Sequence, residues 1–92
     1  MVIVYEELKA AKAAKAAIEA LLTTTRQSVV LAKLMKARGA AILNLSSGDS
    51  LNEARGNVGI ALSSVLHSQL TQEKIDKTKV AINDWIRELE AA

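Results

Sequence analysis

The chain has 92 residues, no cysteine, one histidine (His67) and a formal net charge of +2. A chain of this length forms a single small domain, 1–92, that buries only about 60–65% of the surface exposed by its unfolded form. One histidine without cysteine excludes a disulfide and a zinc site built from one chain, and a charge of +2 does not by itself indicate a polyanion partner. We therefore expect no metal and no cofactor.

The first residues lack the basic segment and the long apolar core of a secretory signal. The longest apolar runs fall well short of the ~18 residues that a membrane-spanning helix needs. We therefore expect a soluble chain without a signal peptide or a transmembrane span, located in the cytoplasm.

Half of the residues are hydrophobic, and most of these are Ala, Leu, Val and Ile; proline and phenylalanine are absent. This composition favours helices that approach one another closely and disfavours sheets, which use aromatic and β-branched pairs. Apolar residues then recur at helical spacing over residues 4–45, with a flanking row one position away. The row consists of Ala14, Leu21, Ser28, Met35 and Ile42. The fold class is predicted to be all-α, with a first long helix over about 4–45.

The clearest boundary is the segment 46–50, Ser-Ser-Gly-Asp-Ser, which is typical of a loop. Ser50 and Glu53 match a capping box, in which each side chain satisfies a free backbone N–H at a helix start. A second amphipathic pattern follows over about 51–90.

Two weaker breaks interrupt these patterns, near Thr24 and Thr71. Both threonines resemble helix caps, and both lie at the same height if the chain folds back at Gly48. Either each helix runs about 40 residues and ~60 Å with a kink, or the chain forms four helices of about twenty residues. The breaks offer few residues for a connection, so we predict the long antiparallel hairpin of two helices, assembling into a helical-bundle oligomer.

Several large apolar residues lie off the main stripe of each expected helix. Two paired helices can cover one stripe each, so a second stripe would be exposed, and exposed apolar patches mark association surfaces. We predict a homo-oligomer interface formed by Val30, Leu31, Leu34, Ala41, Leu45, Ile60, Leu66 and Leu70.

Basic residues are concentrated in the first half of the chain. Residues 1–45 carry a net charge of +4 and residues 46–92 carry −2. Lys9, Lys12 and Lys15 fall along one side of the first helix and are candidate phosphate contacts. Stacking aromatics are missing and the second half is acidic, which argues against nucleic acid as the main partner.

No catalytic group is predicted. Ser63, Ser64 and His67 share a helical spacing, but no acidic residue lies near enough in sequence to orient the imidazole. The carboxylate pairs, such as Glu6 and Glu7, are typical of a solvated face. Trp85 lies off the main stripe, so it either covers the open end of the hairpin or anchors a partner.

The sequence thus predicts a non-enzymatic, self-assembling structural or adaptor protein that acts through helix–helix interfaces, as part of a larger viral or secretion-type assembly. The alternative is a small helical regulator that binds nucleic acid through Lys9, Lys12 and Lys15.

Overall fold

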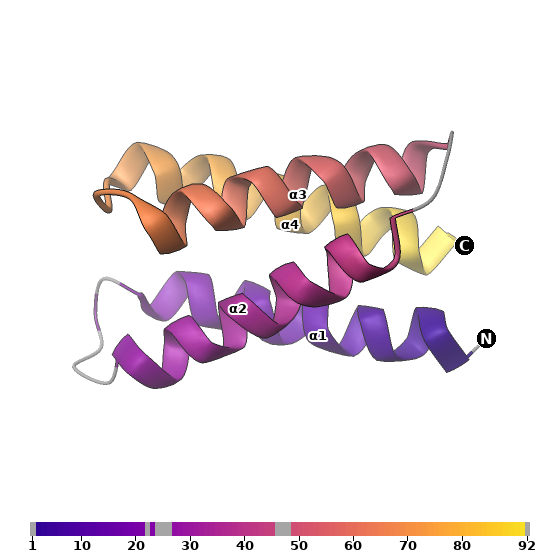
Figure 1. Cartoon of the computed structure of the whole chain (residues 1–92), viewed down its shortest axis with the longest axis horizontal. Coiled ribbons are helices and arrows are strands. Elements are labelled where there is room, and N and C mark those ends of the chain that lie inside the picture. The colour runs from indigo at the N-terminus through magenta and orange to yellow at the C-terminus, as the bar shows by residue number, and fades with distance from the viewer. Residues whose placement is uncertain (1, 22, 24–26, 46–48, 92) are drawn as a thin grey trace.

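The computed structural model describes residues 2–21, 23, 27–45 and 49–91, with side chains from Tyr5 onward (Figure 1). The regular structure in these residues is entirely helical, which confirms the all-α class. The helices are α1 (Val2–Ala20), α2 (Gln27–Leu43), α3 (Ser50–His67) and α4 (Gln72–Ala91).

The four helices form a ring in chain order. Each helix packs against its two neighbours, α1 on α2, α2 on α3, α3 on α4 and α4 on α1. Both termini lie at one end of the bundle, together with the connection between α2 and α3 (Figure 1). No helix in the described part of the chain is long and apolar enough to cross a membrane.

The predicted long hairpin is wrong, and the four-helix alternative is observed. The longest dimension of the molecule is 36 Å, whereas a 40-residue helix would span ~60 Å. The helices end earlier than the breaks suggested, so residues 21–26 and 68–71 lie between them. Connections of this length are ordinary between antiparallel helices.

The first break is fixed by side chains that bind the last carbonyls of α1. The Thr23 hydroxyl and its backbone N–H both donate to the Ala20 carbonyl, at 3.2 and 3.0 Å. The Gln27 side-chain amide donates to the Leu21 carbonyl at 3.3 Å. These bonds satisfy acceptors that a helix end leaves free. The predicted cap at Thr24 lies outside the described residues.

The second break is capped as the sequence predicted. The Thr71 hydroxyl accepts a hydrogen bond from the Lys74 backbone N–H at 3.2 Å. The Lys74 ammonium reaches back to the Ser68 hydroxyl and to the Gln69 carbonyl, both at 2.7 Å. Ser68 itself has an extended backbone, which ends α3.

The start of α3 differs from the prediction by one residue. Asp49 is the N-cap, with an extended backbone and a carboxylate that accepts from the Asn52 N–H at 2.8 Å. Asp49 precedes Ser50 and is an equally good cap that also carries a favourable negative charge. The Ser50 hydroxyl instead donates to the Glu88 carboxylate of α4 at 2.6 Å.

The core is formed by one stripe from each helix. Most of its members are small or medium-sized, and Trp85 is the largest. The buried hydrophobic residues are Ala11, Ala14, Ala17, Ile18 and Leu21 before α2; Val30, Leu34, Ala37 and Ala41 from α2; Ala54, Val58, Leu62 and Val65 from α3; and Ile75, Ile82, Trp85 and Leu89 from α4.

The corrected cap gives a direct test. Because Asp49 satisfies a free N–H of α3, we expect Asp49→Ala to lower the free energy of unfolding by about 1 kcal/mol, a fall in Tm of roughly 4–8 °C for a domain of this size. Ser50→Ala, which removes only an exposed contact, should cost clearly less. Thermal unfolding followed by circular dichroism measures both, and a larger loss for Ser50→Ala would contradict the assignment of the cap.

Candidate functional site

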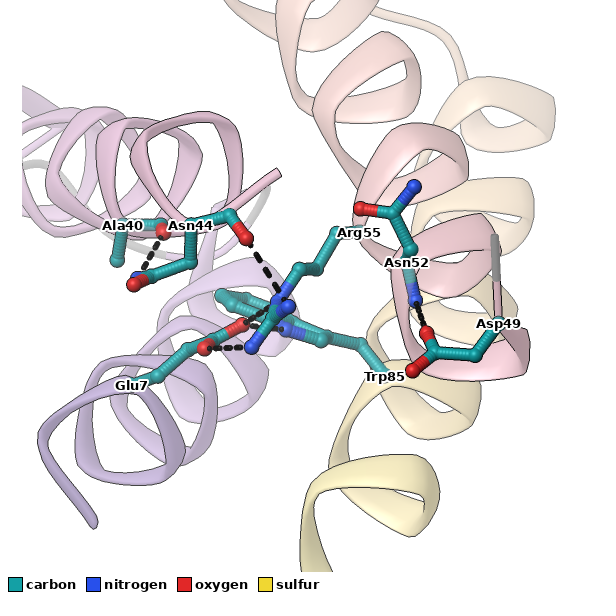
Figure 2. A network of polar contacts seen from close by, with 7 residues as sticks. All are labelled: Glu7, Ala40, Asn44, Asp49, Asn52, Arg55 and Trp85. Carbon is teal, nitrogen blue, oxygen red and sulfur yellow. Dashed lines mark hydrogen bonds and ion pairs between the residues drawn. The ribbon is translucent and has the colours of Figure 1, made fainter. Parts of the chain in front are cut away.

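The most unusual feature of the interior is a buried ion pair between α1 and α3 (Figure 2). Glu7 is 1% exposed, and its two carboxylate oxygens accept from Nε and Nη2 of Arg55, both at 2.7 Å. This two-pronged geometry is the strongest arrangement of a guanidinium and a carboxylate. The Glu7 carboxylate, first through this hydrogen bond, raises the pKa of Arg55 above its ordinary value.

The other two helices join the same cluster. The Trp85 indole N–H of α4 donates to the Glu7 carboxylate at 2.7 Å. Nη1 of Arg55 donates at 3.0 Å to the backbone carbonyl of Asn44, just beyond the end of α2. Within the described residues no buried side-chain nitrogen or oxygen lacks a partner. The cluster therefore ties all four helices together near the end that carries the termini (Figure 2).

Two expectations from the sequence are corrected here. Glu7 belongs to the buried face of α1 and not to a solvated one, and Trp85 is 0% exposed, so it is a core residue and cannot anchor a partner. A signal for both was available. Glu7 lies four residues before Ala11 and seven before Ala14, and Trp85 lies three residues after Ile82 and four before Leu89. Positions three, four and seven apart share a helix face.

The candidate site on the surface is the outer side of α2. This side is apolar, as is the inner side of the same helix. Its exposed large apolar side chains are Val29, Met35, Ile42 and Leu43, the last 86% exposed. Ala32 and Gly39 are exposed on the same helix. We call these six residues the α2 outer stripe. The helix contains no acidic residue.

The predicted interface residues divide into three groups. Val30, Leu34 and Ala41 are buried in the core, so they are not available to a partner. Leu31, Leu66 and Leu70 are partly buried against that core. Leu45 is exposed, and Ile60 is 74% exposed on α3.

The three lysines of the predicted row are all exposed on α1 but have different surroundings. Lys12 lies 3.6 Å from Glu90 of α4. Lys9 instead lines a groove between α1 and α2 together with Lys33 and Lys36. Lys15 is exposed and lines neither this groove nor the others described below.

The residues considered for catalysis are not connected. The Ser63 hydroxyl accepts from Nε of Arg38 on α2 at 2.6 Å, and among the described residues no hydrogen bond joins His67 to Ser63 or Ser64. His67 is exposed at the end of α3. The part of the chain that the structure describes contains no group of three or more His, Cys, Asp or Glu residues able to hold a metal ion.

Comparison of the chain with protein-family models, with curated proteins and with solved structures gives no significant match in any of the three.

The buried cluster predicts a strong contrast between two adjacent glutamates. Glu7→Gln leaves the Arg55 guanidinium buried without a counter-charge, and we expect a loss of about 3–5 kcal/mol in the free energy of unfolding. Glu6→Gln, on the exposed neighbour, should stay within about 0.5 kcal/mol of the original chain. Urea titrations measure both.

A second comparison separates the contribution of the Glu7–Arg55 ion pair to stability from that of side-chain packing. Replacing Glu7 and Arg55 together by Met should cost less than Glu7→Gln alone, because no unpaired charge is left in the core. Additive losses in a double-mutant cycle would contradict the coupling inferred from the 2.7 Å contacts.

Proposed function

We propose that this chain is a non-enzymatic, self-associating helical bundle that acts as a structural or adaptor component through the outer stripe of α2. The observation that carries the proposal is that α2 is apolar on two sides although the fold covers only one. Its inner residues Val30, Leu34 and Ala41 are buried, while Met35 and Leu43 are exposed. Ile42 is 41% exposed and lies at the edge of this side, against Gly59 of α3. A helix with apolar residues all round is ordinarily covered on all sides.

The exposed apolar side chains of α2 supply part of the free energy that association needs. Burying one Leu, Ile or Met side chain from a fully exposed state is worth ~1.5–3 kcal/mol. The four large residues of the α2 outer stripe are already partly covered, so each contributes less than this range. Micromolar affinity corresponds to about 8 kcal/mol, so further contacts from neighbouring helices are required.

The polar groups near the stripe support a protein partner. Lys33, Lys36 and Arg38 are the charged residues of α2, and Arg38 is turned toward α3 by its bond to Ser63. Lys36 lies seven residues from both Val29 and Leu43, so it shares the face of the stripe. The part of the stripe around Met35, Gly39 and Ile42 is uncharged, and a depletion of charge is the compositional mark of the centre of a protein interface.

The main test is the change of one exposed residue to a charged one. We expect Leu43→Asp and Met35→Asp to weaken self-association at least about tenfold, which corresponds to 1.4 kcal/mol, with the helical circular dichroism unchanged. Asn83→Asp, at an exposed position of α4, a helix that does not pack against α2, is the control and should associate like the original chain. Sedimentation velocity over the micromolar range measures the effect, and a monomeric original chain throughout that range would overturn the proposal.

Gly39 provides a second test with opposite effects on stability and association. Apart from its chain neighbours and the backbone of its own helix, a Cβ atom at Gly39 would meet no described atom within 4 Å, and alanine is the better helix former by about 1 kcal/mol. We therefore expect Gly39→Ala to raise the Tm of the monomer while weakening association, because the new methyl group stands where the partner approaches. Unchanged association would place Gly39 outside the interface.

A further inference from the structure

A basic groove runs between α1 and α2, beside the α2 outer stripe. It has a volume of about 270 Å³, a floor of Ala10 and Ala13, and a rim that includes Lys9, Lys33 and Lys36. Glu6 is the acidic residue of the lining. Among the described residues, no ion pair or hydrogen bond occupies the three lysine ammonium groups. Their charges are therefore available to a partner.

An acidic groove runs between α3 and α4. It has a volume of about 160 Å³, and its charged lining residues are Glu53, Asp84 and Glu88 with one guanidinium, Arg87. Asp49 lines the adjoining hollow with Glu53. The Glu53 carboxylate has no ion-pair partner among the described residues.

The two grooves lie on opposite sides of the bundle. The helices follow one another round a ring, with α1 and α2 in the lower half and α3 and α4 in the upper half of Figure 1. The α1–α2 groove and the α3–α4 groove therefore belong to opposite pairs of helices in the ring. Lys9 is near the start of α1 and Glu53 is at the start of α3. Both charged regions thus include residues from the half of the bundle that carries the termini.

Few ion pairs within the chain join its basic first half to its acidic second half. The first half of the sequence carries +4 and the second half −2. Within the described residues only Glu7–Arg55 and Lys12–Glu90 join the two halves as ion pairs. The remaining imbalance leaves a basic α1–α2 groove and an acidic end of the α3–α4 side around Glu53, Asp84 and Glu88. The other end of the α3–α4 side is lined by Lys74 and Lys77.

The α2 outer stripe is also too small to form a stable interface alone. A helix of 17 residues is ~26 Å long and ~10 Å wide, which gives a projected area of roughly 260 Å². A standard interface buries roughly 800 Å² on each partner. The adjoining basic groove is the natural extension of the contact surface.

We propose that copies of this chain associate head to tail, with the α2 outer stripe and the basic α1–α2 groove of one copy seated on the acidic α3–α4 side of the next. This inference rests on the self-association proposed above and specifies its geometry. A two-fold pairing of α2 with α2 would place Lys33 and Lys36 beside the same lysines of the other copy, and like charges repel. The head-to-tail contact pairs opposite charges and repeats, so it forms rings or filaments.

Charge reversal with complementation tests this geometry. Variant one carries Lys33→Glu and Lys36→Glu, and variant two carries Glu53→Lys and Asp84→Lys. Each alone should lose association at least about tenfold, because like charges then meet at every contact. An equimolar mixture should recover it, since a reversed groove on one variant meets a reversed groove on the other. A single chain with all four substitutions should also recover association.

Control measurements distinguish charge reversal in the two grooves from a general change in surface charge or a loss of folding. Lys15→Glu reverses an exposed lysine outside both grooves and should associate like the original chain. Circular dichroism of each variant checks the fold. Salt titration of the unmodified chain gives an independent measurement, and association should weaken as ionic strength rises.

Each contrary outcome has a distinct meaning. If the unmodified chain associates and both variants associate equally well, the head-to-tail geometry is overturned while the proposed function stands. Association of variant two as strong as that of the unmodified chain, together with tighter binding of variant one to the unmodified chain than to itself, indicates the two-fold arrangement and also overturns it. A monomeric unmodified chain removes both proposals. If that monomer also binds a DNA duplex and variant one does not, the basic groove serves a nucleic acid instead.

Discussion

The buried Glu7 carboxylate is the constraint on which the arrangement of the helices depends. A desolvated charge costs several kcal/mol unless it is paired and fully hydrogen-bonded, and here Arg55 and Trp85 meet that requirement. In an extended hairpin folded about Gly48, Arg55 would stand opposite residue 41, about 50 Å along the helix from Glu7. The pair forms only if both long segments fold back at their middles, so the cluster selects the four-helix ring over the hairpin.

The predicted apolar stripe is confirmed in α3, where Ala54, Val58 and Val65 lie in the core. It is wrong in α2, because positions that continue the spacing of the first segment, such as Val29, Gly39 and Leu43, are exposed, and Val30, Leu34 and Ala41 are buried instead. The chain leaves the helix after Ala20, so α2 does not keep the register of α1. The apolar spacing also could not show whether a helix continues through Thr71, because a capped break and a kink leave the stripe in the same register. That choice depends on contacts between residues far apart in sequence, such as Glu7 with Arg55, which no local pattern specifies.

The predicted exposed surface depended on how many helix faces point into the core. A hairpin of two long helices buries one apolar stripe on each. A ring of four shorter helices buries one stripe on each of four segments, so apolar residues that point in different directions along the sequence can all be buried. Val30, Leu34 and Ala41 are therefore buried within one chain, and what a partner could cover is reduced to the outer side of α2 with Ile60. Within the described residues, the buried apolar side chains pack against one another and no buried polar side chain lacks a partner, without a second copy. In the proposed assembly, association adds stability by mass action rather than completing the core.

Apolar and charged groups have different roles in the proposed contact. The α2 outer stripe would supply affinity, yet an apolar stripe alone accepts any apolar surface and does not fix orientation. Exposed lysines such as Lys9 and Lys36 add little affinity, but they favour an acidic neighbour and disfavour another basic surface. The basic side and the acidic side belong to opposite grooves of one chain. The same charges that favour a partner therefore also fix how successive copies are oriented, with the basic groove of one facing the acidic groove of the next. In a head-to-tail assembly, an open chain of copies has an unpaired basic side at one end and an unpaired acidic side at the other. Further copies can add at both ends until the assembly closes into a ring, so ring closure decides whether growth stops.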